Sequence, residues 1–169
     1  MNWPPLEPPV THHVLAVLGW IELGNPAEAA TELAQVPAAL MDHPDVLEVR
    51  WQLGARRAEW AACAGFGAAL VEALPDRPFG WIHRSFALHE MRRTQQARDL
   101  LVPAVSRFPK EWVIRYNLAC YACQLGRLEE ARDWLDQAVR IGERSRILAM
   151  AREDRDLAPL WKGLRPGAD

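Results

Sequence analysis

Cys120 and Cys123, in the sequence Cys-Tyr-Ala-Cys, are the first candidates for chemistry, because this spacing serves redox and metal sites. A redox pair needs a helix N-terminus, where the dipole lowers a thiol pKa, whereas this pair falls in the middle of a predicted helix. A zinc site needs about four ligands; His89 could join the two cysteines if the fold brings it close, but no fourth Cys or His is in clear reach. We expect both cysteines to be small packing residues; a thiol or metal site stays open as an alternative.

Other catalytic patterns are absent from the sequence. It contains no Ser-His-Asp elbow, no phosphate-binding loop and no H-E-x-x-H motif. Several arginines cluster in the chain, and they predict a solvated face paired with glutamates rather than an RNA-reading surface. These are Arg50, Arg56, Arg57, Arg84, Arg92 and Arg93. We therefore expect no enzymatic activity, no catalytic residue, no metal and no cofactor.

Composition sets the broad class of the protein. The chain has 169 residues, of which 50% are hydrophobic and 25% charged, as is typical of a folded domain. A net charge of −2 gives no general attraction to nucleic acid or to an anionic membrane. We predict a cytoplasmic protein from three features. The three cysteines lack the spacing of a disulfide framework, residues 1–10 lack the features of a signal peptide, and no apolar run reaches about 20 residues.

The stretch from Trp112 to Ser145 predicts two helices separated by a turn at Gly126, since glycine commonly ends a helix. Counting back from Trp112 in steps of 34 residues places three more units, with starts at Val10, Pro44 and Pro78. The twentieth residue of every unit is then small: Ala29, Cys63, Ala97 and Ala131. The fifteenth residue, where the turn should fall, is Gly24, Ala58, Arg92 and Gly126.

Two of the predicted helices contain residues that disturb helical structure. Gly65 and Gly67 weaken the helix expected from Trp60 to Leu74, or else they allow another helix to approach closely. Pro103 falls inside the helix expected from Thr94, its N-cap, to Arg107, and it should kink that helix or remove a hydrogen bond.

The stretch Trp112–Ser145 resembles a tetratricopeptide repeat, a 34-residue helix–turn–helix unit, at Leu118-Ala119, Gly126, Ala131 and Ala138. The resemblance implies an all-α fold, a right-handed α-solenoid of about four antiparallel helix pairs. Residues 10–143 would hold these repeats, with approximate bounds 10–43, 44–77, 78–111 and 112–145. Residues 144–164 would form a C-terminal helical cap, because a solenoid must cover its last apolar face.

Residues outside the repeats form an arm and a tail. The arm, 1–9, holds four prolines and is either frayed or docked through Trp3 and Leu6 on this chain or on a neighbour. The tail, 165–169, is expected to be disordered.

The resemblance also implies a concave groove lined by the first helices of the units. The third unit would contribute Phe79, Ile82, Phe86 and His89, and the fourth would contribute Tyr116, Cys120 and Cys123. An apolar patch of this kind usually marks an interaction site. Equally, the C-terminal helices could fold back over the groove and make Phe86 and Tyr116 part of the core.

Members of this family that read acidic C-terminal tails use lysine at the fifth position of a unit and asparagine at the ninth. The corresponding pairs here are Val14/Leu18, Glu48/Gln52, Ile82/Phe86 and Tyr116/Cys120. This carboxylate clamp is therefore missing, which favours an apolar or helical ligand.

The leading hypothesis is a non-catalytic protein–protein interaction module that binds a peptide or a partner helix in its groove. The first alternative is a structural homo-oligomer that buries the arm or the open face of the first unit. The second is the thiol or metal site at Cys120 and Cys123.

Overall fold

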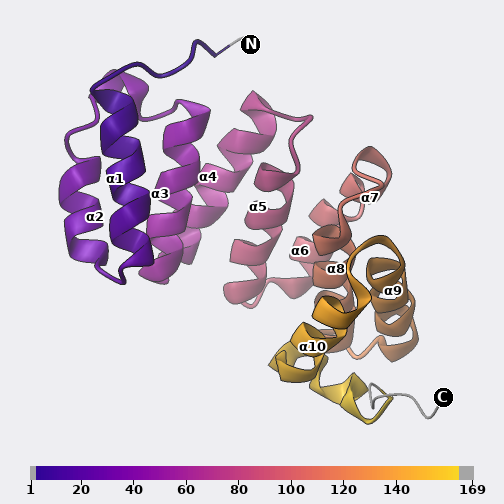
Figure 1. Cartoon of the computed structure of the whole chain (residues 1–169). Helices are drawn as coiled ribbons and strands as arrows, with labels where there is room; N and C mark the ends of the chain where they lie inside the picture. Colours follow the sequence, from indigo (N-terminus) through magenta and orange to yellow (C-terminus); the bar gives the residue numbers. More distant parts are fainter. Residues whose placement is uncertain (1–2, 164–169) are drawn as a thin grey trace. The chain divides into compact units, whose positions relative to one another are not determined.

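The computed structural model describes residues 3–163, with side chains described as far as Trp161. Every regular element in this range is an α-helix or a 3-10 helix, and the range contains no strand (Figure 1). The predicted fold class, an all-α helical repeat, is confirmed. The predicted tail, 165–169, and Leu164 of the predicted cap lie outside the described residues.

Four 13-residue helices begin one 34-residue period apart. They are α1 (Val10–Glu22), α3 (Pro44–Arg56), α5 (Pro78–Glu90) and α8 (Trp112–Gln124). Proline opens α3 and α5, where its missing N–H removes no helical hydrogen bond. The side chain of His43 then caps α3 by accepting a hydrogen bond from the Asp45 amide at 3.2 Å.

Each of these helices is followed by a second helix. The second helices are α2 (Pro26–Leu33), α4 (Trp60–Ala73), α6 (Thr94–Leu101) and α9 (Leu128–Ile141). The four connecting turns share a left-handed residue, with φ of 73° at Gly24, 55° at Ala58, 61° at Arg92 and 75° at Gly126. Each turn therefore needs the same backbone conformation, whether or not glycine supplies it.

Pro103 interrupts the hydrogen bonding of a helix, which is one of the two effects expected of it. Helix α6 stops at Leu101, and a separate short helix, α7 (Ala104–Arg107), follows Pro103. The helix expected from Thr94 to Arg107 is thus divided in two at Pro103, because proline cannot donate the next helical hydrogen bond. The expected N-cap, Thr94, is instead the first helical residue, and its hydroxyl lies 3.0 Å from Nδ1 of His89.

The chain divides into two compact units, unit 1 (Met1–Ala87) and unit 2 (Leu88–Asp169), and each is described by itself. In unit 1, apolar residues of α1, α2 and α3 form a continuous core around Val17, Ala29 and Val46. The arm packs on this unit: Leu6 contacts the core, and the carbonyl oxygen of Pro4 accepts a hydrogen bond from Nε2 of His43 at 2.9 Å. Residues 3–9 are thus docked on their own chain.

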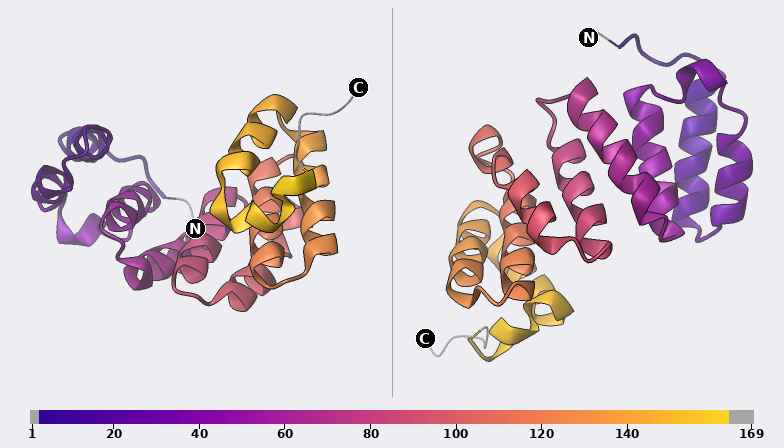
Figure 2. Two further views of the ribbon diagram at one scale, coloured as in Figure 1. Left: turned by 90° about the horizontal axis from the view of Figure 1, so that it is seen from below. Right: turned by 180° about the vertical axis from the view of Figure 1, so that it is seen from behind.

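In unit 2, α8 and α9 pack as a pair, with Leu118, Ala119 and Leu135 fully or almost fully buried. The chain continues into α10 (Arg144–Glu153) and the 3-10 helix η2 (Arg155–Gly163). Helix α10 packs on α9, and η2 packs on α8, α9 and α10 (Figure 2). Ile147 and Leu157 have no exposed surface, so the apolar face of the last helix pair is covered.

Candidate interaction surface

The seven predicted groove residues all lie on α5 and α8. Unit 1 contains the first three, Phe79, Ile82 and Phe86. Unit 2 contains the other four, His89, Tyr116, Cys120 and Cys123. The two sets are considered in turn.

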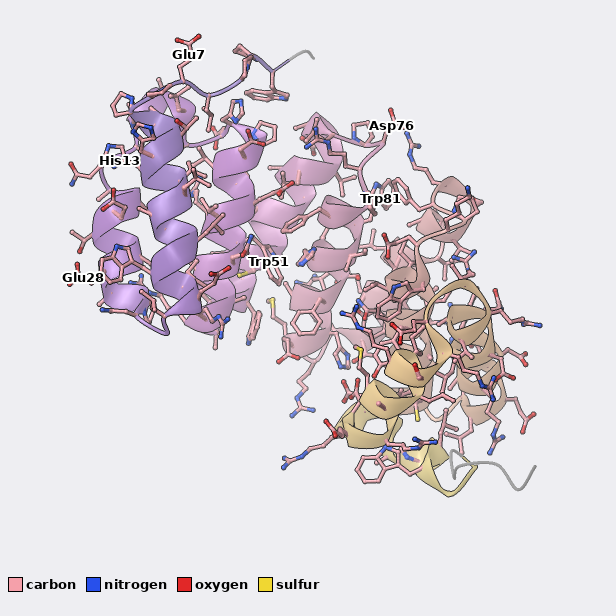
Figure 3. All side chains as sticks on the ribbon, viewed as in Figure 1. Glu7, His13, Glu28, Trp51, Asp76 and Trp81 are labelled. Carbon is pink, nitrogen blue, oxygen red and sulfur yellow. The ribbon has the colours of Figure 1, made fainter. Side chains whose placement is uncertain are left out.

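The unit 1 set belongs to an aromatic cluster, which we define as Trp51, Trp60, Phe79, His83 and Phe86. Trp51 projects from α3 (labelled in Figure 3) and is 7% exposed. Its ring meets those of Phe79, His83 and Phe86 edge-on, with centroid distances of 6.1, 4.3 and 6.3 Å. Phe86 also meets Trp60 at 5.8 Å, so it joins α3, α4 and α5. Phe79 and Phe86 remain partly exposed, whereas Ile82 is buried.

His83 is an uncharged member of this cluster. Its ring stacks on that of Phe79 at 3.7 Å, and its Nδ1 donates a hydrogen bond to the Phe79 carbonyl oxygen at 2.9 Å. Burial lowers the pKa of His83, because a charged imidazolium is poorly solvated among aromatic rings. The cluster therefore presents an apolar rather than a cationic surface at neutral pH.

The unit 2 set contacts the end of the chain, which we call the C-terminal segment, Asp154–Leu160. The hydroxyl of Tyr116 donates a hydrogen bond to Oδ2 of Asp154 at 2.9 Å, and Sγ of Cys120 lies 3.5 Å from the same oxygen. Nε2 of His89 lies 2.9 Å from Oδ2 of Asp156. Three of the four predicted site residues thus meet this segment, while Tyr116, Cys120 and the neighbouring Cys123 are at most 5% exposed.

The same segment perturbs the ionisation of these groups. Burial raises the pKa of Tyr116, of Cys120 and of Cys123, and the nearby carboxylates of Asp154 and Asp156 raise it further. Both thiols therefore stay protonated at neutral pH, which makes them poor nucleophiles. Among residues 3–163, no three His, Cys, Asp or Glu side chains are grouped so that they could hold a metal ion.

We predict that Tyr116→Phe will flatten the pH dependence of stability above pH 10. Tyrosine ionises near pH 10 in an unfolded chain, while burial beside Asp154 keeps Tyr116 neutral to higher pH in the folded chain. Its contribution to stability is complete below pH 10 and is lost above it, because the unfolded chain then releases a proton that the folded chain retains. Urea unfolding at pH 9.5–11.5 should give a wild-type slope steeper by about 1.4 kcal/mol per pH unit. Parallel slopes would contradict the prediction.

Sequence reasoning missed Trp51 and the two aspartates. Trp51 could have been found from its size, since tryptophan is highly buried on average. Asp154 and Asp156 fall within the predicted cap, 144–164, and nothing local in the sequence indicates their partners on α5 and α8. The described helices include none long and apolar enough to cross a membrane.

Comparison with known proteins supports the helical-repeat fold. A family model for the tetratricopeptide repeat matches residues 88–153. The solved structure of MamA MSR-1 is 20% identical, with a TM-score of 0.67 over 80% of this chain and 78% of that chain. TTC0263, a thermophilic tetratricopeptide-repeat protein of Thermus thermophilus, is 18% identical, with a TM-score of 0.67 over 92% of this chain and 94% of that one. No curated protein matches.

These structures share less than a quarter of their residues with this chain, so they establish its fold and leave its ligand open. The match over residues 88–153 agrees with the resemblance seen in the sequence at Trp112–Ser145. The resemblance is thereby confirmed: residues 88–153 match the tetratricopeptide repeat family, and the chain has the fold of that family.

Proposed function

We propose that this chain is a protein–protein interaction module that binds a peptide or a partner helix, with one candidate surface on α5 in unit 1 and a separate one on α8 in unit 2. Tetratricopeptide-repeat domains are generally non-catalytic scaffolds for protein partners, and the chain has their fold. The preformed helix pairs would limit the entropy cost of binding to the ordering of the ligand.

One observation carries this proposal: the face of α8 in unit 2 already holds a peptide segment, supplied by the chain itself. The C-terminal segment places one carboxylate against Tyr116 and Cys120, and another against His89. It also buries Leu157 and Leu160 completely or almost completely. A surface that binds one extended or 3-10 segment through polar and apolar contacts has the features of a peptide site.

The aromatic cluster of unit 1 supports the same function with different chemistry. Phe79, Phe86 and Trp60 are only partly buried, so each offers ring surface to a ligand. Aromatic side chains contribute strongly to protein interfaces, because they bury a large area at a low entropy cost. An apolar or helical ligand suits this surface, in line with the missing carboxylate clamp.

We predict that Phe86→Ala and Tyr116→Ala, made singly and together, will reduce partner capture. The partner would lose a ring from unit 1 or a hydroxyl and ring from unit 2, and removal of an interface anchor typically weakens binding by about tenfold or more. Affinity capture from the native host followed by mass spectrometry measures the effect, with circular dichroism to verify helical content.

The control is Ile141→Ala, which truncates an apolar side chain at the end of α9 that is 38% exposed. This variant should capture the same partners as the wild type. Undiminished capture by the folded Phe86 and Tyr116 variants would place the binding site elsewhere.

A structural homo-oligomer is the second candidate. Leu15 and Leu23, at 64% and 75% exposure, are large apolar side chains on or next to α1, and a second copy could cover them. Light scattering on the purified chain distinguishes the two candidates, since an interaction module of this kind does not require self-association.

A further inference from the structure

The C-terminal segment has a simple recognition pattern, with two acidic residues followed by two leucines. Asp154 and Asp156 are separated by one residue, and Leu157 and Leu160 are separated by two. The carboxylates accept hydrogen bonds from side chains of α5 and α8, while both leucines are buried. Gln124 adds a hydrogen bond from its Nε2 to the Asp156 carbonyl oxygen at 3.0 Å.

The hydrogen bonds to the two carboxylates come from side chains that carry no permanent positive charge. They are a phenol, a thiol and an imidazole, from Tyr116, Cys120 and His89. Such donors recognise a carboxylate by position and hydrogen bonding rather than by net charge. The site should therefore select a peptide that has an acidic residue at each of these two positions.

The backbone of the segment makes mainly local hydrogen bonds. The Asp154 amide bonds to Met150, the Leu157 amide bonds to the Asp154 carbonyl oxygen, and the Asp156 amide bonds to the Asp154 side chain at 2.9 Å. Its contacts with α8 therefore depend on side chains and one carbonyl group. Release of the segment would break none of the backbone hydrogen bonds within α8 or α9.

We infer that this face of α8 is the binding site for a partner peptide with the same pattern, two acids followed by two leucines, and that the C-terminal segment is its intramolecular competitor. The inference rests on the proposed function and specifies its ligand. A tethered segment acts at an effective concentration in the millimolar range. The apparent affinity for a partner is therefore the intrinsic affinity multiplied by the fraction of molecules in which the segment is released.

The test uses the full chain and a fluorescent peptide with the sequence of Asp154–Trp161, DRDLAPLW. Fluorescence anisotropy compares the wild type with the double variant Asp154→Ala/Asp156→Ala, whose own segment has lost both carboxylates. We expect the variant to bind the peptide at least about tenfold more tightly, because a larger fraction of its sites is free.

Two controls isolate the carboxylates. Arg155→Ala changes the exposed residue between them and should bind the peptide as the wild type does. A peptide with alanine at both aspartate positions should bind neither protein. Equal affinity of the wild type and the double variant, or no binding by either, would overturn the inference.

Hydrogen–deuterium exchange on the wild-type chain gives a second readout, which remains informative if the double variant does not fold. Excess peptide should speed amide exchange in the C-terminal segment and leave α8 and α9 protected, and unchanged exchange would overturn the inference. If the Phe86 and Tyr116 variants lose partner capture but the peptide does not compete with the C-terminal segment, this ligand would be rejected and the proposed function would be retained. Unaffected capture would reject the proposed function itself.

Discussion

Replacing Trp51 with alanine is expected to lower the free energy of unfolding by about 3–5 kcal/mol. Trp51 is 7% exposed and lies at the centre of the aromatic cluster, where it contacts Phe79, His83 and Phe86. Alanine would leave a cavity bounded by rings that cannot collapse without moving α3 or α5. Urea unfolding followed by circular dichroism measures the loss.

A second substitution at the same position separates packing from hydrogen bonding. The indole N–H of Trp51 is buried and has no hydrogen-bond partner among the described residues. Trp51→Phe removes this unsatisfied donor while keeping a ring, so we expect it to cost much less than Trp51→Ala. The control is Trp81→Ala, because Trp81 is only partly buried and its Nε1 bonds to the Pro75 carbonyl oxygen at 3.0 Å. An equal loss for Trp51→Ala and Trp81→Ala would contradict the central place of Trp51.

Replacing Gly67 with alanine is expected to lower the free energy of unfolding by about 1–3 kcal/mol, although alanine is the better helix former. A Cβ atom at Gly67 would lie 2.7 Å from both the Cα and the backbone nitrogen of Arg84, on α5. At Gly80 of α5, it would lie 2.7 Å from the backbone nitrogen of Val71, on α4. Each helix thus uses a glycine to admit the backbone of the other, and a backbone cannot move aside as the end of a side chain can.

Gly65 provides the matched control within the same helix. A Cβ atom there would meet nothing within 4 Å, so Gly65→Ala should raise the free energy of unfolding by about 0.5–1 kcal/mol through helix propensity alone. Thermal unfolding of the two variants should therefore shift the midpoint in opposite directions. A shift in the same direction would show that close approach does not govern this pair of helices.

The sequence was informative wherever a local rule determines the structure. Proline at the start of α3 and α5, and glycine at the turns Gly24 and Gly126, indicated the helix pattern and the all-α fold. Of the two explanations for glycine in α4, close approach holds at Gly67, while Gly65 faces open space. Sequence alone could not distinguish these positions, because the difference depends on where α5 lies.

The candidate site was less predictable, because its contacts join residues far apart in the chain. Tyr116 and Asp154 are separated by 38 positions, and neither residue type indicates the other. Two interpretations of Tyr116 were open, a groove residue or a core residue. It is buried beneath the C-terminal segment, and its role in binding a partner remains a prediction.

The four turns with a left-handed residue mark the repeats of this chain through their backbone conformation. Gly24 and Gly126 adopt positive φ readily, whereas Ala58 and Arg92 do so at a local cost of about 1–2 kcal/mol each. All four residues occupy the same position of the 34-residue period. The positive φ angle therefore repeats in all four units, whereas glycine occurs at that position in only two of them. Comparison of backbone angles along the chain would therefore detect the two middle repeats, whose turn residues would escape a search for glycine.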